Sequence, residues 1–342
     1  MKKLLFSALM TALLSVVLLS CSGGGGESGG SSVQVGTTWR AVNVDSSTVM
    51  YGKVVWTGSQ FFAAMNSGHA YSLDGETWTF APTVYSIPVF GDQAQIVNDD
   101  SKLLVIGGSN NRGRFEYSYD EGITLSQKNF PSSIKWIMAI AYNGQKFAGF
   151  GFDISKSIMV SSADGFSWTS KSAGSAYTYV NINDMCWNGS KFVGVGRYYI
   201  QRRGGGNVSE YSSIVTSSDG DNWNLNTSSR FNKLYSVSCS GQKLVAVGDL
   251  NAVVTSVDGE TWVAQTAGIP VAEPGTKYAL NDVIWAENQY VAVGNLGLIL
   301  TSPDGENWTQ QDTGRNDDLL SVAYGAGKLV IFGRSKEILV SP

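Results

Sequence analysis

Six aspartates recur along the chain at nearly regular intervals, and their side chains are the first candidates for chemistry. They are separated by 46, 44, 55, 39 and 46 residues and stand at Asp74, Asp120, Asp164, Asp219, Asp258 and Asp304. A hard cation needs several oxygen ligands at one point, whereas this spacing offers one carboxylate in each repeat. We therefore expect no metal site and assign these aspartates a structural role.

His69 is the only histidine of the chain and thus the only candidate base for Ser–His catalysis. It follows Ser67 and Gly68, and no Gly-x-Ser-x-Gly elbow lies near it. We interpret it as a solvated loop residue. The sequence predicts no catalytic residue and no cofactor.

The aspartates belong to a repeated word, Ser-x-Asp-Gly-x-x-Trp. Its five complete copies end at Trp78, Trp168, Trp223, Trp262 and Trp308, and a sixth copy at residues 118–122 has no tryptophan after it. Glycine permits a positive φ, aspartate accepts backbone N–H bonds, and tryptophan can cover a sheet. The word therefore predicts a stabilised turn that leads into a covering strand.

Four short β-rich runs, separated by Gly, Asn and Asp, accompany each copy of the word. Four strands with a period in the forties are typical of a β-propeller blade. The chain stops inside the word at Ser341 and Pro342, while residues 36–39 read Gly-Thr-Thr-Trp and supply the missing part. The sequence predicts an all-β, seven-bladed propeller of four-stranded antiparallel blades over residues 33–342, with the last blade closed by the N-terminal strand.

The composition agrees with this fold and excludes some partners. Of 342 residues, 40 are glycine, 43% are apolar and only 15% are charged, so the chain can bury a core but lacks the profile of a helix bundle. A net charge of −4 provides no basic footprint for nucleic acid. We expect a monomer.

The first residues predict export and anchoring. Lys2 and Lys3 precede an apolar run over residues 4–19, which is the layout of a signal peptide. Residues 18–21, Leu-Leu-Ser-Cys, resemble the bacterial lipobox, which implies cleavage after residue 20 and a lipidated, palmitate-bearing Cys21. Residues 21–32 then form a Gly/Ser-rich tether. The expected location is the bacterial cell envelope, at the outer membrane because Ser22 follows the cysteine, with the membrane bound through the lipid.

The repeated word resembles the Asp-box, or BNR repeat, of the sialidase superfamily, although one residue is missing between Asp and Gly. The resemblance covers residues 33–342 and implies that the box is structural and lies opposite the ligand face. Sialidases also need three arginines, and their first arginine motif is matched here only by Tyr85-Ser86-Ile87-Pro88, with serine in the arginine position.

We therefore expect a non-catalytic scaffold that binds or assembles an envelope protein or a glycan. A sialidase-like glycoside hydrolase is the alternative, because the separation of a carboxylate pair cannot be read from a sequence. The candidate ligand residues lie in the loops away from the Asp-Gly turns, including a long connection over residues 196–211. They are Arg112, Arg114, Arg197, Tyr198, Tyr199, Arg202, Arg203, Asp249 and Arg334.

Two cysteines and an aromatic column complete the sequence-based expectations. Cys186 and Cys239 fall one register step apart in adjacent blades, and we expect them to be buried free thiols because neighbouring blades should hold them beyond bridging distance. The column of Cys239 contains aromatic residues that we expect to pack between blades: Trp56, Tyr142, Trp187, Trp285 and Tyr324.

Overall fold

The computed structural model divides the chain into a unit Met1–Val33 and a compact unit Gln34–Pro342. It describes residues 36–43, 52–65, 68–82, 94–106, 113–154, 156–174, 180–200, 209–228, 231–239, 242–266, 268, 270, 278–334 and 337–341. The expected signal peptide, the tether and Cys21 lie outside these residues.

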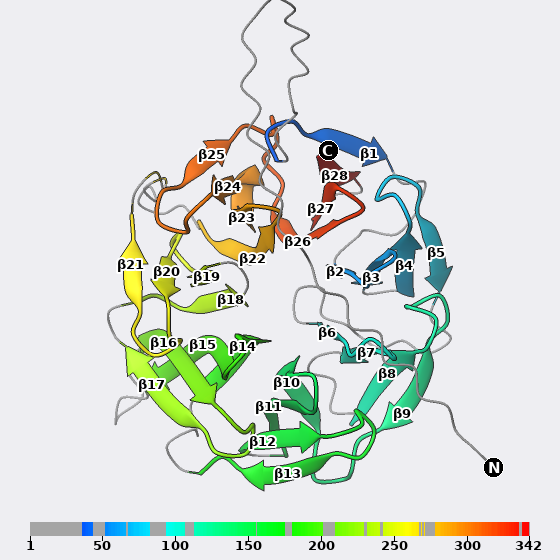
Figure 1. The fold of residues 1–342 in the computed structure, drawn as a ribbon, viewed down its shortest axis with the longest axis vertical. Coiled ribbons are helices and arrows are strands. Elements are labelled where there is room, and N and C mark those ends of the chain that lie inside the picture. Colours follow the sequence, from blue (N-terminus) through cyan, green and yellow to red (C-terminus); the bar gives the residue numbers. More distant parts are fainter. Residues whose placement is uncertain are drawn as a thin grey trace, which may run out of the picture. The chain divides into compact units, whose positions relative to one another are not determined.

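The compact unit forms seven four-stranded antiparallel sheets arranged in a ring, as the sequence predicts (Figure 1). Blade 1 contains β2 (Gly52–Trp56), β3 (Phe61–Met65), β4 (Gly68–Ser72) and β5 (Thr79–Pro82). Blade 2 contains β6 (Gln95–Asn98), β7 (Leu103–Ile106), β8 (Arg114–Ser118) and β9 (Ser126–Asn129). Blade 3 contains β10 (Trp136–Tyr142), β11 (Phe147–Phe152), β12 (Ser157–Ser162) and β13 (Thr169–Ser172).

The remaining blades follow the same order, with the inner strand first. Blade 4 contains β14 (Val180–Trp187), β15 (Phe192–Ile200), β16 (Ser209–Ser217) and β17 (Asn224–Ser228). Blade 5 contains β18 (Leu234–Ser238), β19 (Leu244–Gly248), β20 (Val253–Ser256) and β21 (Val263–Gln265). Blade 6 contains β22 (Leu280–Ala286), β23 (Gln289–Gly294), the short helix η2 (Asn295–Gly297), β24 (Ile299–Ser302) and β25 (Thr309–Gln311). Blade 7 contains β26 (Leu319–Gly325), β27 (Lys328–Gly333), β28 (Glu337–Ser341) and β1 (Arg40–Asn43).

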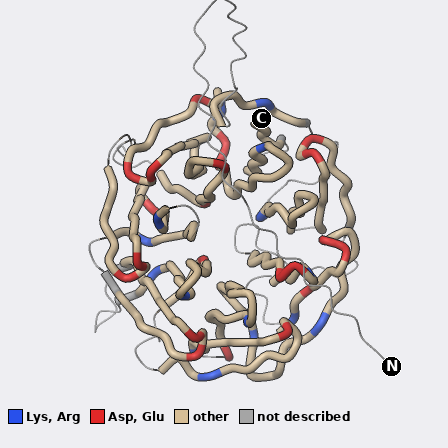
Figure 2. Tube along the Cα trace, viewed as in Figure 1, with Lys and Arg blue, Asp and Glu red and all other residues tan. Residues whose placement is uncertain are grey.

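The repeated word forms a hydrogen-bonded turn between the third and fourth strands of a blade. In blade 1, the amide of Gly75 donates to Ser72 Oγ at 2.9 Å, and the Trp78 indole donates to the Gly75 carbonyl at 2.9 Å. The amides of Thr77 and Glu76 donate to Asp74 Oδ1 at 2.7 and 2.8 Å, and they lower the pKa of Asp74 to about 2. The same bonds recur in blades 3 to 6. Figure 2 shows acidic residues recurring around the outer part of the ring. The predicted structural role of the aspartates therefore matches their contacts.

Glycine has two physical reasons to occupy this turn. Gly75 adopts φ +73°, which favours glycine over any residue with a side chain. A Cβ atom there would also lie 2.6 Å from Val330 Cγ2 of blade 7. The sixth copy in blade 2 keeps the Ser118 and Asp120 bonds across one additional residue, Glu121.

The first and last strands close the ring within one shared blade. β1 pairs antiparallel with β28, with Arg40 opposite Val340. The amide of Gly36 donates to Ser341 Oγ at 2.9 Å, and Gly36 has φ +83°. The internal turns have the same hydrogen bond from glycine to serine and the same positive φ at the glycine. The predicted closure by the N-terminal strand is confirmed: the last copy of the word is divided between the two ends of the chain.

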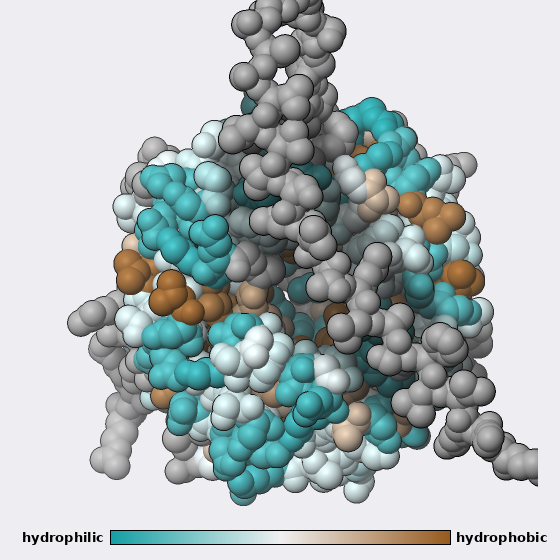
Figure 3. All heavy atoms as spheres, in the orientation of Figure 1, coloured by the Kyte–Doolittle hydropathy of each residue, from teal (hydrophilic) through white to brown (hydrophobic). Residues whose placement is uncertain are grey.

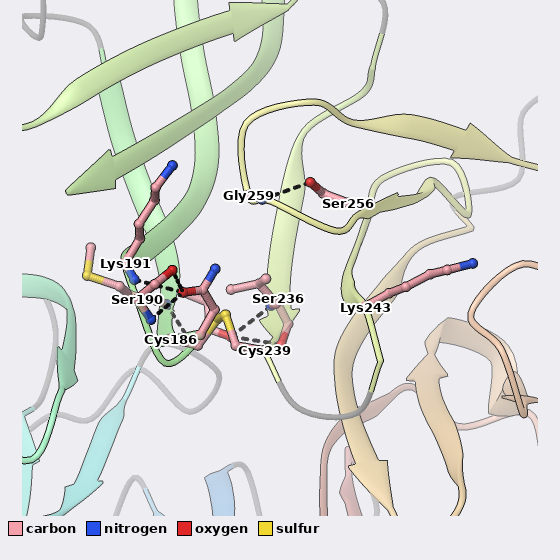
Figure 4. Close-up of a disulfide and its surroundings, with 12 residues drawn as sticks. Cys186, Ser190, Lys191, Ser236, Cys239, Lys243, Ser256 and Gly259 are labelled. Carbon is pink, nitrogen blue, oxygen red and sulfur yellow. Dashed lines mark hydrogen bonds between the residues drawn. A yellow bond between two sulfur atoms is a disulfide. The ribbon is translucent and has the colours of Figure 1, made fainter. Parts of the chain in front are cut away.

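The expectation of free thiols is wrong. Cys186, in β14, and Cys239, directly after β18, form a disulfide with their Cα atoms 5.8 Å apart (Figure 4). The bond joins blades 4 and 5. The error comes from treating all equivalent strands as equally distant, whereas inner strands converge around the centre of the ring (Figure 1).

The expectation that His69 is a solvated loop residue is also wrong. It lies within β4, is buried, and its Nε2 is 3.3 Å from the carbonyl oxygen of Ile123 in blade 2. Burial lowers its pKa. The residue therefore packs between two blades, and its imidazole has no serine partner among the hydrogen bonds of the described residues.

Three observations concern the helices, the metal-binding groups and the surface of the described residues. Within them, no helix has the length and apolar character that crossing a membrane would require. The same residues contain no group of three or more His, Cys, Asp or Glu side chains arranged to hold a metal ion. The face in Figure 3 is mainly hydrophilic, with small separate apolar patches.

Glu116 occupies a buried position that is apolar in every other blade. Counted from the serine of the word, its equivalents are Ala70, Val160, Val215, Val254, Leu300 and Leu339, all buried. Burial raises the pKa of Glu116 to about 7. Because the folded pKa lies above the unfolded one, the protonated carboxyl supports the fold at acid pH, and that support is lost as pH rises towards 7.

We expect Glu116→Gln to raise the free energy of unfolding at pH 8 by up to about 3 kcal/mol and to leave it nearly unchanged at pH 4. Denaturant unfolding across this pH range measures the effect. The exposed residue Glu260 provides the control, since Glu260→Gln removes a carboxylate without removing a buried one. Equal pH slopes for wild type and Glu116→Gln would contradict the prediction.

Candidate functional site: a polar cavity where the inner strands begin

The site is built on β-bulges, one in the inner strand of each of five consecutive blades. The pairing of the first strand with the second shifts register between Ile137 and Ala139 in β10, and at the equivalent points of β14, β18, β22 and β26. A bulge inserts one residue that has no direct partner and redirects its side chain. The inserted residues are Met138, Asn183, Tyr235, Asn281 and Leu320.

All five inserted residues line one cavity of about 910 Å³. The cavity lies where inner strands begin and second strands end, on the side opposite the Asp-Gly turns by strand polarity. Its described lining is completed by residues of blades 3 to 7 and their connections: Trp136, Ile137, Phe152, Asn181, Ile182, Arg197, Lys233, Asp249, Leu250, Tyr278, Ala279, Asn295, Asp318 and Arg334.

Among the described residues, the lining carries three cations and two carboxylates. Lys233 Nζ lies 3.8 Å from Asp249 Oδ2, and Arg334 Nε lies 3.5 Å from Asp318 Oδ2. Arg197 is the third cation. Aromatic rings and amides share the cavity with these charges, so it can offer stacking surfaces, hydrogen bonds and ionic contacts to one ligand.

Asparagine side chains tie the walls of the cavity together. Asn183 Nδ2 donates to the Leu234 carbonyl of the next blade at 2.7 Å, and Asn281 Nδ2 donates likewise to the Leu319 carbonyl at 2.7 Å. Each bulged asparagine therefore joins its own inner strand to the following one. In the wall of the cavity, side-chain hydrogen bonds therefore join blade 4 to blade 5 and blade 6 to blade 7.

Beneath the cavity, a polar belt joins the inner strands. Ser236 Oγ lies 2.8 Å from both Asp184 Oδ2 and Asp282 Oδ1, and Ser321 Oγ donates to Asp282 Oδ2 at 2.9 Å. Lys53 Nζ lies 3.9 Å from a carboxylate oxygen of each aspartate. Burial acts to lower the pKa of Lys53, but the two carboxylates raise it overall. The belt links blades 1, 4, 5, 6 and 7, and its carboxylates are occupied by protein donors.

A second, smaller cavity lies on the other side of the belt. It measures about 400 Å³ and is lined by Lys53, Asp184 and Asp282 together with Trp56, Trp285 and Tyr324. Trp56 packs against the core between blades 1 and 7, and Trp285 packs against the core between blades 5 and 6, as expected. Within their own blades, the ring of Trp56 lies edge-on to Phe61 and that of Trp285 lies edge-on to Tyr290. The aromatic column is thus both packing and the wall of this cavity.

The structure brings together three of the ligand residues expected from the sequence: Arg197, Asp249 and Arg334. Tyr198 instead packs against the core between blades 3 and 4, and Arg114 donates to Gln127 within blade 2 at 3.3 Å. The side chain of Tyr199, and all of Arg112, Arg202 and Arg203, lie outside the described residues.

Sequence reasoning missed the inner-strand residues of the cavity, above all Asn183, Asn281 and Tyr235. One signal was present: Asn-Asp occurs at the same place in two blades, Asn183-Asp184 and Asn281-Asp282, inside otherwise apolar strands. Polar pairs there are costly unless they are bonded. The two asparagines are bulged residues, and the two aspartates belong to the belt.

Comparison with known proteins supports the fold. No family model and no curated protein matches the chain. Among solved structures, YCF48 bound to D1 peptide has a TM-score of 0.60 at 13% identity, covering 91% of this chain and 99% of that one. YCF48 from Cyanidioschyzon merolae has a TM-score of 0.55 at 13% identity, covering 89% and 98%. Virginiamycin B lyase from Staphylococcus aureus has a TM-score of 0.64 at 7% identity, covering 89% and 98%. At these identities the chain is similar to the three in fold alone.

Proposed function

We propose that this propeller is a non-catalytic scaffold that binds a protein partner in the cavity of about 910 Å³ formed where the inner strands begin. One observation carries the proposal: bulges in five successive blades direct side chains into that single cavity. Rigid rings that present varied loop residues are suited to binding. YCF48, a similar propeller, has been seen with a bound D1 peptide, so the fold can receive a polypeptide.

The alternative of a glycoside hydrolase finds less support. The described lining of the cavity contains two arginines and no glutamate, whereas the sialidase set needs three arginines and a Tyr–Glu pair. The two carboxylates of the described cavity lining, Asp249 and Asp318, lie beside cations, with nitrogen–oxygen distances of 3.8 and 3.5 Å. A glycan remains the second ligand class, because aromatic rings and amides also suit sugar hydroxyls and faces.

Recovery of a partner by cross-linking tests the scaffold proposal. Cells expressing the full chain are cross-linked, and the protein bound to wild type is compared with that bound to Tyr278→Ala/Arg334→Gln. We expect at least a tenfold loss of the recovered partner. Lys191→Gln, on the side of the Asp-Gly turns, is the matched control and should recover the partner normally. Equal recovery by the double variant, with a native melting temperature, would exclude this cavity as the site.

We further propose that the propeller is held at the bacterial outer membrane through lipidated Cys21. The lipobox-like residues 18–21 support this. Cys21→Ala removes the acceptor thiol, so the protein should move from the membrane fraction to the soluble fraction after signal cleavage, and labelling with a palmitate analogue should be lost. A cleaved Cys21→Ala protein that stays with the membranes would refute the anchor.

A further inference from the structure

The second cavity, of about 400 Å³, is walled by aromatic rings from three adjacent blades. Trp285, Tyr324 and Trp56 stand at the ends of the inner strands β22, β26 and β2, which neighbour one another in the ring (Figure 1). All three residues are half-buried, so part of each side chain is exposed. The volume lies within the range of about 300–1,000 Å³ that is typical of small-ligand sites.

The three rings are held in place before any ligand arrives. Trp56 packs against the core between blades 1 and 7. The centroid of the Trp285 ring lies 4.6 Å from that of the Tyr290 ring, and the Tyr324 hydroxyl donates a hydrogen bond to Glu287. Because side chains that are already fixed lose little conformational entropy on binding, the wall is preorganised.

Lys53 brings hydrogen-bond donors to the floor of this cavity. Its Nζ lies 3.9 Å from a carboxylate oxygen of both Asp184 and Asp282, which is an ionic contact but not a hydrogen bond. The carboxylates already accept from backbone amides, that of Met185 at 2.9 Å and that of Val322 at 3.0 Å. Among the described residues, the Lys53 ammonium has no hydrogen-bond acceptor, so its three N–H groups can donate to a ligand oxygen.

The charges of the floor favour a neutral ligand. An anion placed at the Lys53 ammonium would also approach two carboxylates, and a cation placed near those carboxylates would approach the ammonium. A neutral hydroxyl group accepts from the ammonium without either repulsion. The aromatic wall requires apolar surface on the same ligand. A pyranose sugar combines hydroxyl groups with apolar C–H groups on one ring.

We propose that a neutral pyranose sugar, free or at the end of a glycan, binds in this cavity. Its C–H groups pack against Trp56, Trp285 and Tyr324, and one of its hydroxyl oxygens accepts a hydrogen bond from Lys53. The polar belt lies between this cavity and the one assigned to the protein partner, so the sugar site goes beyond the proposed function and does not rest on it.

Fluorine NMR of the full chain labelled with 5-fluorotryptophan tests the sugar site. Single Trp→Phe variants assign the signals. The neutral probes are the methyl glycosides of glucose, galactose, mannose and N-acetylglucosamine, and methyl glucuronide is the acidic probe. At least one neutral glycoside should shift the signals of Trp56 and Trp285 in a saturable way and leave that of Trp168, a buried tryptophan of blade 3, unchanged. The glucuronide should shift none of them.

Substitutions separate the contribution of the ring from that of the ammonium. Tyr324→Leu and Lys53→Met should each weaken binding of the active glycoside at least fivefold, whereas Tyr324→Phe keeps the ring and should bind within twofold of wild type. Tyr119→Leu, which alters an exposed tyrosine in the turn of blade 2, is the control and should bind like wild type. A trisaccharide ending in the same sugar identifies a glycan end as the source if it binds more tightly, and a free sugar if it binds equally.

Three results would overturn the sugar site: no neutral glycoside shifts the Trp56 and Trp285 signals even at tens of millimolar, the Trp168 signal shifts as much as theirs, or a folded Tyr324→Leu binds with wild-type affinity. Tyr324→Leu and Tyr324→Phe keep the test decisive even where Lys53→Met fails to fold. None of these results decides the scaffold proposal, which stands or falls with partner recovery by Tyr278→Ala/Arg334→Gln.

Discussion

Trp308→Ala is expected to lower the free energy of unfolding by about 3–5 kcal/mol, the range for removing a large buried aromatic side chain. The Trp308 side chain is 4% exposed and belongs to the core between blades 5 and 6. Its indole also donates to the Gly305 carbonyl at 3.0 Å, so the substitution removes packing and a bond of the turn together. Denaturant unfolding of the purified full chain measures the change.

Trp262 provides the matched control for this prediction. It occupies the same position of the word and makes the same bond to Gly259, but it is only half-buried. Trp262→Ala should therefore cost clearly less than Trp308→Ala. A loss below about 1 kcal/mol for Trp308→Ala would mean that the ring contributes little to the blade interface.

Removal of residues 33–43 is expected to have the second large effect. The deletion takes away β1 and Trp39, which packs against the core between blades 6 and 7. It also leaves β28 as an unpaired edge, and exposed edges promote association between chains. We expect a loss of about 3 kcal/mol or more from the half-buried tryptophan, the strand pairing and the Gly36 hydrogen bond together, with aggregation near the lowered melting temperature.

Thermal unfolding followed by light scattering tests the deletion. Deletion of residues 22–32 is the control, because it shortens the chain by as many residues without touching β1. Ser341→Ala is a milder companion that removes the acceptor of the Gly36 amide, with an expected cost of about 1 kcal/mol. If the chain without residues 33–43 melts like wild type, the closing strand is dispensable.

The fold was predictable because the same turn word and the same four β-rich runs recur along the chain. The turn word carries its glycine, aspartate and tryptophan for local reasons, and its division between residues 36–39 and Ser341 revealed the closure. Each part of the word is recognised from residues that are adjacent in sequence. This needs no knowledge of distances across the ring.

The site was less predictable because it depends on those distances. Asn183, Tyr235 and Asn281 reach one cavity only through bulges, and a bulge is a shift in pairing between strands rather than a property of one strand. The disulfide between Cys186 and Cys239 depends in the same way on how closely inner strands approach. His69 was misplaced for a simpler reason: β4 begins at Gly68, directly before it.

The shared last blade also bears on how the chain is made. The Gly36 amide and Ser341 Oγ are 305 residues apart in sequence, so their bond is among the least local contacts a chain of this length can form. Contacts of that kind are entropically costly to establish and are made slowly. Blades 1 to 6 each consist of consecutive strands and can assemble as synthesis proceeds, but β1 must wait for β28. Only a chain translated as far as β28 can complete the circle, and a product terminated before it keeps an open sheet that quality-control proteases and chaperones can recognise.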